Sequence, residues 1–349
     1  MKKLITVIGA RPQFVKAAAF SSALKEKSTI EHILVHTGQH YDYQMSKIFF
    51  EQLDISKPQY SLSCGGGSHA ENTSKMMVGL EEIFINEAPD AVCVFGDTDS
   101  TLAAAITAKK LCIRLIHVEA GLRSFNNNMP EEINRIVTDR VSDLLFTSSN
   151  EGVSNLIDEG IDGSKIRDYG DIMYDCYLSY RNFFTKPSIV IEDRYCLLTL
   201  HRQENTDDAK ILRKRIEQVN ALSRSIRVVF PVHPRTKKLI EECNIELHAN
   251  VLVVDPMGYF EFGWLIEHSE FIVTDSGGLQ KEAYFAGKFC FTLRNETEWV
   301  ELTNRSFNVL VQTQDSIDLE HIVDIPESSS IYGVGDTSKK IADFLEENL

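Results

Sequence analysis

Residues 4–16 read LITVIGARPQFVK and contain the transition that decides the fold. An apolar run, Leu4–Ile8, ends at Gly9 and gives way to the helical pattern Phe14–Lys27. Gly9 permits a tight turn, and Pro12 suits the first turn of a helix, where its missing N–H has no partner to lose. The stretch therefore predicts a buried strand that turns directly into a helix.

The same alternation of short apolar strands and helical segments runs along the whole chain. The strands predicted in the first half are Leu4–Ile8, Ile33–His36, Ala91–Phe95, Leu115–Val118 and Leu144–Phe146. Those of the second half are Tyr195–Leu200, Val228–Val232, Val251–Val254, Phe271–Thr274, Phe289–Leu293 and Val309–Val311. Nearly continuous hydrophobicity in strands that alternate with helices is typical of a parallel sheet covered on both faces.

Two such runs predict two domains. At 349 residues, the chain has room for more than two domains of roughly 150 residues each. The expected fold class is α/β, with two doubly wound Rossmann-like domains that face each other across a cleft. We expect an N-terminal domain over residues 1–172, a C-terminal domain over 190–332, and a helix over 335–349 that can pack back on the first domain.

Composition excludes several classes of protein. Asp and Glu outnumber Lys and Arg, giving a net charge of −15, which opposes nonspecific binding to nucleic acid or anionic lipid. No apolar run approaches the roughly 18 residues of a membrane helix, so we expect neither a nucleic acid nor a membrane partner. The seven cysteines are odd in number and widely spaced, which indicates reduced thiols in a cytoplasmic protein.

Two basic residues follow the first predicted strand. Arg11 and Lys16 lie near the N-terminal end of the first helix, where free backbone amides attract anions. This arrangement indicates a phosphate site. An ordinary strand–helix turn with solvated charges explains the same residues equally well, so both interpretations stay open.

A second strand–helix turn reads Thr274-Asp275-Ser276-Gly277-Gly278. The glycines let an anion approach the backbone, and Ser276 can cap the helix or donate to a phosphate. Glu282 falls four residues after Gly278, on the same helix face, where a carboxylate can accept hydrogen bonds from ribose hydroxyls. The alternative is a capped helix with a surface glutamate. An acid one turn past a glycine pair favours the nucleotide site.

Polar residues also follow other strands. The run from His201 to Asn205 ends a predicted strand, and five consecutive polar residues there are costly unless solvated or used. Asp97 and Glu119 each come directly after a buried strand, which predicts that they converge on one crevice. Glu131 begins a helix, where an acid is stabilising in any case, and Arg135 is a suitable i,i+4 partner.

Other polar features have a structural interpretation. Asp99 and Glu132 lie near Asp97 and Glu131 in the sequence and can be structural residues with no part in the chemistry. Residues 65–70 read GGGSHA and match the dinucleotide pattern G-x-G-x-x-A. The preceding residues 60–63 make a poor buried strand, and the pattern is weak without a strand–turn–helix context. We therefore expect a mobile loop there.

Taken in order, eight motifs of this chain resemble those of the non-hydrolysing UDP-N-acetylglucosamine 2-epimerases. They are Gly9-Ala10-Arg11-Pro12, Gly38-Gln39-His40, Gly96-Asp97-Thr98, Val118-Glu119-Ala120-Gly121-Leu122-Arg123, Pro130-Glu131-Glu132-Ile133-Asn134-Arg135, His201-Arg202-Gln203-Glu204-Asn205, Pro231-Val232-His233 and Asp275-Ser276-Gly277-Gly278-Leu279-Gln280. The resemblance implies a glycosyltransferase-B-like fold, an active site in the interdomain cleft and a homodimer.

The resemblance also implies a reaction, the inversion of C2 in UDP-GlcNAc to give UDP-ManNAc. Family enzymes expel UDP, lose the C2 proton to form a 2-acetamidoglucal and add UDP back, so neither a nicotinamide nor a metal is required. The residues expected to act on the leaving group or on the proton are Lys16, Asp97, Glu119, Glu131 and His201. Those expected to bind UDP or the sugar are Arg11, Arg135, His233, Ser276, Gly277, Gly278 and Glu282.

Three departures from the commonest family pattern make the sugar less certain than the reaction. Asp42 follows the Gly-Gln-His motif, Lys75 stands where many members have Arg, and Trp299 ends a segment that usually reads Glu-Arg-Pro. These departures resemble the branch that acts on modified sugars, such as UDP-2,3-diacetamidoglucuronate or UDP-N-acetylfucosamine-pathway intermediates. A hydrolysing epimerase, a glycosyltransferase of the same fold and a non-catalytic nucleotide-sugar sensor stay open as alternatives.

Overall fold

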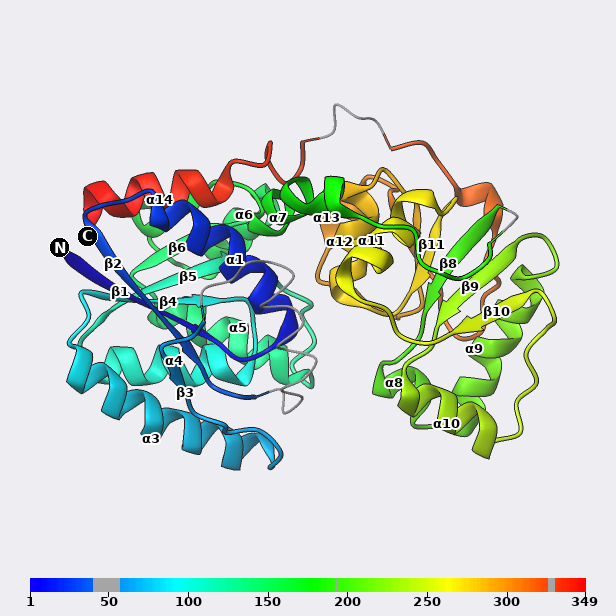
Figure 1. The fold of residues 1–349 in the computed structure, drawn as a ribbon, viewed down its shortest axis with the longest axis horizontal. Coiled ribbons are helices and arrows are strands. Elements are labelled where there is room, and N and C mark those ends of the chain that lie inside the picture. Colours follow the sequence, from blue (N-terminus) through cyan, green and yellow to red (C-terminus); the bar gives the residue numbers. More distant parts are fainter. Residues whose placement is uncertain (40–56, 192–193, 326–329) are drawn as a thin grey trace. The chain divides into compact units, whose positions relative to one another are not determined.

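A computed structural model describes residues 1–39, 57–191, 194–325 and 330–349, with only the backbone of Arg11 and Pro12 described (Figure 1). It divides the chain into two compact units. Unit 1 comprises Met1–Leu178 together with Ser330–Leu349, and unit 2 comprises Ser179–Ser329. Each unit is built on its own sheet, and each is described by itself below.

Unit 1 contains a seven-stranded sheet in the order β3-β2-β1-β4-β5-β6-β7, with every described pairing parallel. Its strands are β1 (Lys2–Ile8), β2 (Ile30–His36), β3 (Tyr60–Ser61), β4 (Ala91–Phe95), β5 (Arg114–Ala120), β6 (Leu144–Thr147) and β7 (Ile166–Asp168). Its helices are α1 (Arg11–Lys25), α3 (His69–Glu87), α4 (Asp99–Lys110), α5 (Pro130–Val141), α6 (Asn150–Asp158), α7 (Ile172–Tyr180), which runs on into unit 2, and α14 (Thr337–Asn348).

Helices cover both faces of this sheet. In Figure 1, α1 and α14 lie on one face, while α3, α4 and α5 lie on the other. All five residues of β4 are fully buried, because a central parallel strand meets helices on both sides. This explains why the strand reads as an unbroken apolar run, and it confirms the predicted doubly wound fold.

Unit 2 contains a six-stranded parallel sheet in the order β10-β9-β8-β11-β12-β13. Its strands are β8 (Tyr195–Thr199), β9 (Arg227–Pro231), β10 (Val251–Val254), β11 (Ile272–Thr274), β12 (Cys290–Thr292) and β13 (Asn308–Leu310). Its helices are α8 (Gln203–Thr206), α9 (Ala209–Leu222), α10 (Pro234–Glu242), α11 (Tyr259–His268), α12 (Gly277–Phe285) and α13 (Val300–Asn304).

The segment around residues 65–70 differs from the expected mobile loop. Ser68 caps α3, because its hydroxyl accepts the Glu71 amide at 3.3 Å while the Glu71 carboxylate accepts the Ser68 amide at 2.9 Å. Such a reciprocal capping box fixes the start of a helix. The strand before it, β3, is a two-residue edge strand, so the segment still lacks the strand–turn–helix context of a dinucleotide site.

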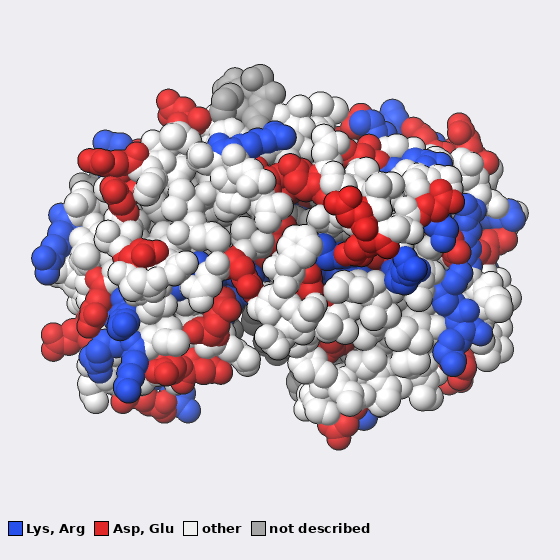
Figure 2. Space-filling model, turned by 180° about the vertical axis from the view of Figure 1, so that it is seen from behind, with Lys and Arg blue, Asp and Glu red and all other residues white. Residues whose placement is uncertain are grey.

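The distribution of charged residues and cysteines can be compared with the expectations from composition. Figure 2 shows acidic and basic side chains interspersed over the visible face. No helix in the described ranges is long and apolar enough to cross a membrane. All seven cysteines are free thiols, and five of them are buried in the two cores: Cys64, Cys93, Cys176, Cys196 and Cys290.

The last helix, α14, is attached to unit 1 through a buried carboxylate. Asp175 accepts hydrogen bonds from the Thr337 amide at 3.1 Å, the Ser338 amide at 2.6 Å and the Ser338 hydroxyl at 2.5 Å. These donors belong to the first turn of α14, where backbone amides have no partner inside the helix. Ile341 and Leu345 on the same helix are fully buried.

We predict that Asp175→Ala destabilises unit 1 by about 1–3 kcal/mol, because it leaves buried donors unsatisfied. Urea unfolding followed by circular dichroism measures the change. Lys340→Ala is the matched control, since its exposed pair with Asp336 on the same helix is worth about 0–1 kcal/mol. Equal losses in the two variants would show that the cap is not what holds α14.

Candidate functional site

Each sheet has one point at which the strand order reverses. In unit 1 it lies between β1 and β4, and in unit 2 it lies between β8 and β11. Ligands of open parallel sheets bind beyond the carboxyl ends of the strands at such points. Lys16 and Asp97 follow the two strands of the first point, and His201 and Ser276 follow those of the second.

A buried ion pair lies over the turn after β4. Lys16 on α1 and Glu119 on β5 are 5% and 6% exposed, and their side chains form a salt bridge. A Cβ placed on Gly96 would lie 3.0 Å from Glu119 Oε2 and 3.5 Å from Lys16 Nζ. The two charged groups therefore rest directly on the Gly96 backbone, beside Asp97.

The backbone at Glu119 departs from a regular strand. Its φ is +71°, and the register of β5 against β6 shifts between Val118 and Ala120. A positive φ is unfavourable for a residue with a side chain and costs about 1–3 kcal/mol. A bulge of this kind redirects a side chain, and here it accompanies the turn of Glu119 toward Lys16.

Asp97 is held by Arg135. The Nε and Nη2 atoms of Arg135 donate to Asp97 Oδ2 at 2.9 and 2.6 Å, and Nη1 donates to Glu132 Oε2 at 2.7 Å. Asn134 Nδ2 donates to the backbone carbonyl of Asp97 at 2.9 Å. Arg135 is 3% exposed, whereas the Asp97 side chain is 29% exposed. Consecutive residues of α5 thus fix the Asp97 turn and leave its carboxylate accessible.

The remaining acids of unit 1 fall into two groups. Glu132 accepts the backbone amides of Ser124 and Phe125 at 3.0 and 2.9 Å, and Asp99 pairs with His69 at 2.7 Å. Both therefore have structural partners, as expected for bystanders. Glu131, by contrast, is exposed in the first turn of α5.

Two predicted positions of unit 1 fall outside the described residues. Arg11 begins α1, but its side chain lies outside the described part of the structure. Asp42, one of the three departures from the family pattern, also lies outside it. Lys75 is exposed on α3.

In unit 2, one fully buried carboxylate organises the turn after β8. Asp275 accepts the backbone amides of His201 and Arg202 at 2.9 and 2.8 Å, and the Asn205 side chain at 3.2 Å. His201 Nδ1 lies 3.1 Å from Asp275 Oδ1, and its ring is 44% exposed. Burial alone would raise the pKa of Asp275, but the hydrogen bond and charge of His201 and the backbone amides bring it below its usual value.

The N-terminus of α12 is open on one side. Ser276 precedes the helix, and its hydroxyl does not cap it. A Cβ on Gly278 would meet no atom within 4 Å, while one on Gly277 would lie 2.4 Å from Glu298 Oε1. Trp299 Nε1 donates to the Gly277 carbonyl at 2.9 Å. The open space at Gly278 suits an anion at the first turn of the helix, whereas the Glu298 carboxylate beside Gly277 opposes one.

Two further predicted residues lie in unit 2. Glu282 is partly accessible on α12, and burial raises the pKa of its carboxyl to about 7, against the opposing charge of Lys281. His233 caps α10, where its Nδ1 accepts the Arg235 amide at 3.2 Å. Its position after β9 agrees with a ligand-facing end of the sheet, and its described contact is structural.

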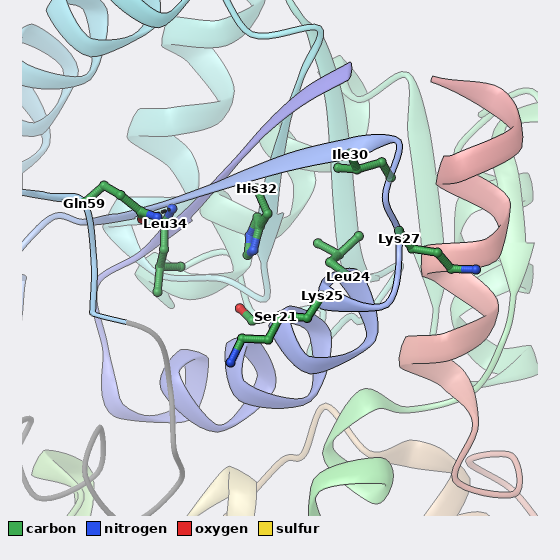
Figure 3. Close-up of a pocket in the computed structure, with 8 residues that line it drawn as sticks. All are labelled: Ser21, Leu24, Lys25, Lys27, Ile30, His32, Leu34 and Gln59. Carbon is green, nitrogen blue, oxygen red and sulfur yellow. Dashed lines mark hydrogen bonds between the residues drawn. The ribbon is translucent and has the colours of Figure 1, made fainter. Parts of the chain in front are cut away.

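A cavity of about 230 Å³ lies elsewhere in unit 1 (Figure 3). Its lining residues are Ser21, Leu24, Lys25, Lys27, Ile30, His32, Leu34 and Gln59. Burial lowers the pKa of His32 to about 4, so its ring is neutral near neutral pH. None of the predicted site residues lines this cavity, so it does not mark the predicted chemistry. The described residues also hold no cluster of three or more side chains suited to a metal ion.

Comparison with known proteins identifies the relatives of this chain. The profile of the UDP-N-acetylglucosamine 2-epimerase family matches residues 22–346. A UDP-2,3-diacetamido-2,3-dideoxy-D-glucuronate 2-epimerase from Pseudomonas aeruginosa is 46% identical, over 98% of this chain and 99% of its own. A UDP-N-acetylglucosamine 2-epimerase from Methanocaldococcus jannaschii is 42% identical, over 88% of each chain.

Solved structures show the same relationship. The crystal structure of the Methanocaldococcus jannaschii UDP-GlcNAc 2-epimerase in complex with UDP-GlcNAc and UDP has a TM-score of 0.89 and 36% identity to this chain, covering 99% of it and 100% of the other. The Neisseria meningitidis UDP-GlcNAc 2-epimerase bound to UDP-GlcNAc has a TM-score of 0.88 and 29% identity, covering 99% and 100%.

Proposed function

This chain belongs to the UDP-N-acetylglucosamine 2-epimerase family, and on that basis we propose that it inverts C2 of a UDP-N-acetylhexosamine, converting UDP-GlcNAc to UDP-ManNAc. One structural observation supports the proposal above the others. Asp97 follows β4, and Glu119 lies near the end of the neighbouring parallel strand β5, where Arg135 and Lys16 respectively hold them. Two positioned carboxylates suit a proton removal and a proton return.

The proposed chemistry follows from the acidity of the sugar. The C2 proton is not adjacent to a carbonyl, so its direct removal is unfavourable. Loss of UDP from C1 together with the C2 proton gives a 2-acetamidoglucal, and re-addition of UDP with a proton on the other face gives the epimer. The two reaction steps together involve no net oxidation, so the reaction requires no redox cofactor. In this scheme Asp97, Glu119 and the exposed Glu131 are the candidates for proton transfer.

Unit 2 is the proposed holder of UDP. The open N-terminus of α12 offers the amides of Gly277 and Gly278 to the diphosphate, with Ser276 beside them. The Asp275 carboxylate holds the His201 ring, which then faces the developing charge of the leaving group. Glu282, one turn further along α12, is the proposed acceptor for the ribose hydroxyls.

A modified sugar is a second candidate substrate. The 46% identity to a UDP-2,3-diacetamido-2,3-dideoxy-D-glucuronate 2-epimerase favours it, as do the departures at Lys75 and Trp299. Proton NMR in heavy water, with UDP-GlcNAc and the diacetamido substrate offered separately, distinguishes the two. Deuterium entering C2 with a nucleotide-linked product indicates epimerisation, free sugar with UDP indicates hydrolysis, and absence of exchange with either substrate contradicts the proposal.

We also propose a cytoplasmic homodimer. The free cysteines support a reducing compartment. On α3, Val78 and Ile85 are 71% and 62% exposed, and their seven-residue spacing puts them on one helix face. Sedimentation velocity is expected to show a dimer, which Val78→Glu weakens by charging that face. Val78→Thr, which keeps the side-chain shape and adds no charge, is the control, and a wild-type monomer at all concentrations would exclude the dimer.

We predict that Asp97→Asn and Glu119→Gln each lower turnover by roughly 10²–10⁴-fold, the usual effect of losing a general acid or base. The affinity for UDP is expected to survive, because these residues belong to unit 1. Steady-state kinetics with calorimetry of UDP binding tests both statements. Near-normal turnover in both variants would remove these acids from the mechanism.

We predict that UDP affinity weakens by about tenfold between pH 8 and pH 6 through Glu282 alone, because only its ionised form accepts both ribose hydroxyls. The pKa of about 7 is raised, so the charged form is present above pH 7 and is lost below it. The UDP phosphate titrates near pH 6 as well, and Glu282→Gln serves as the control that retains this second effect. Parallel pH profiles for the two proteins would exclude Glu282 from the ribose site.

A further inference from the structure

A fully buried histidine lies under the turn that carries Asp97. His117, on β5, has a ring with no exposure to solvent. Its Nε2 lies 2.8 Å from the carbonyl oxygen of Gly96, and its Nδ1 lies 2.7 Å from Asp139 Oδ1 on α5. Both ring nitrogens therefore have a single short contact to an oxygen atom.

The hydrogen-bonding chemistry fixes the protons of this ring. A carbonyl oxygen can only accept, so Nε2 must carry a proton. The other oxygen of Asp139, Oδ2, lies 2.8 Å from Arg123 Nη1 and accepts the Gly121 amide at 3.1 Å. An acid paired with a guanidinium is held in its ionised form, so Asp139 is a carboxylate, and it too can only accept. Both nitrogens of His117 must donate, which makes the ring an imidazolium.

The surrounding charges balance this buried cation. Arg123 Nη1 lies 2.8 Å from Asp139 Oδ2, and Arg123 Nε and Nη2 donate to Glu159 at 2.6 and 2.7 Å. The two cations, His117 and Arg123, thus face the two anions, Asp139 and Glu159. Nearby, the pair Lys16–Glu119 above Gly96 is also neutral in sum. A buried charge with such partners is retained at a tolerable cost.

His117 and Asp139 together connect the two turns that carry the proposed acids. His117 donates to the Gly96 carbonyl, directly before Asp97. Asp139 Oδ2 accepts the Gly121 amide at 3.1 Å, two residues after Glu119. Gly96, Glu119 and Gly121 all have positive φ values, of +61°, +71° and +81°. One carboxylate thereby restrains both unusual turns, one of them through the imidazolium.

We propose that Asp139 and His117 are positioning residues for the epimerisation, with His117 held as a buried imidazolium that fixes the turns of Asp97 and Glu119. This inference rests on the proposed function for its kinetic part only. Neither residue reaches the substrate in the proposal, since both are buried. Their effect is on the spacing and orientation of the two acids.

The protonation state can be measured without substrate. Protein labelled with ¹⁵N-histidine gives long-range ¹⁵N–¹H correlations that report which ring nitrogens carry protons. His117 is expected to show two protonated nitrogens, because each of them faces an oxygen atom that can only accept. In Asp139→Asn it is expected to show one. A singly protonated His117 in the wild-type protein would overturn the proposal.

The positioning role is tested by Asp139→Asn against Asp143→Asn. Asp143 is the matched control, because it accepts the Leu115 amide at 2.8 Å and pairs with Lys109, at the other end of β5. Asp139→Asn is expected to lower kcat by about 10²-fold, the effect of a misplacement near 1 Å, with little change in KM. Asp143→Asn is expected to lower stability and leave kcat within about twofold.

Two outcomes separate this proposal from the proposed function. Equal kcat values for the two variants at equal loss of stability would overturn the positioning role. If the wild-type protein turned over neither sugar, the proposed function would fail. The ¹³C chemical shifts of the Asp97 and Glu119 carboxyl groups would then test the positioning role without turnover. They are expected to change in Asp139→Asn and not in Asp143→Asn. Unchanged shifts would overturn the proposal.

Discussion

The arrangement of unit 1 depends on the buried polar face of α5. Asn134, Arg135 and Asp139 occupy positions one and four residues apart on this helix and are all at most 4% exposed. Buried polar groups must be paired with partners of good geometry. Here the partners are the turns after β4 and β5, so the requirement for pairing also determines where Asp97 and Glu119 lie.

Unit 2 uses the same principle with fewer residues. Asp275 directly follows β11, is fully buried, and accepts the backbone amides that follow β8. It connects the two strands that flank the reversal point of the sheet. In both units a buried aspartate restrains a strand-end turn, and the exposed groups beside it remain accessible. The end of a strand is well suited to carry a functional side chain, because the sheet holds the backbone of the strand rigid.

In unit 1 the sequence predicts the inner strands and not the two edge strands, β3 and β7, for a physical reason, whereas in unit 2 it predicts the edge strands β10 and β13 as well. β4 is buried on both faces and reads as five apolar residues, whereas β3 and β7 have only two and three residues and include polar ones. Asp97, Glu119 and Ser276 are predictable as strand-end residues. Asp139 is not, because a polar residue in a helical pattern normally lies on the solvated face. Its partners, His117 and the Gly121 amide, are distant in sequence and become neighbours only through the sheet order.

The conformation of Glu119 shows why several residues are needed to hold it in place. Its positive φ opposes folding by about 1–3 kcal/mol, and its carboxylate is buried, which adds a desolvation cost. The Lys16 ammonium offsets the charge, and the Asp139 carboxylate holds the next turn through Gly121. Gly96 completes the arrangement, because a Cβ there would lie 3.0 Å from Glu119 Oε2, closer than nearly all such contacts. Gly96, Lys16 on α1 and Asp139 on α5 are therefore all needed to hold the strained Glu119 carboxylate in place. A substitution at any one of the three also affects the contacts of the other two.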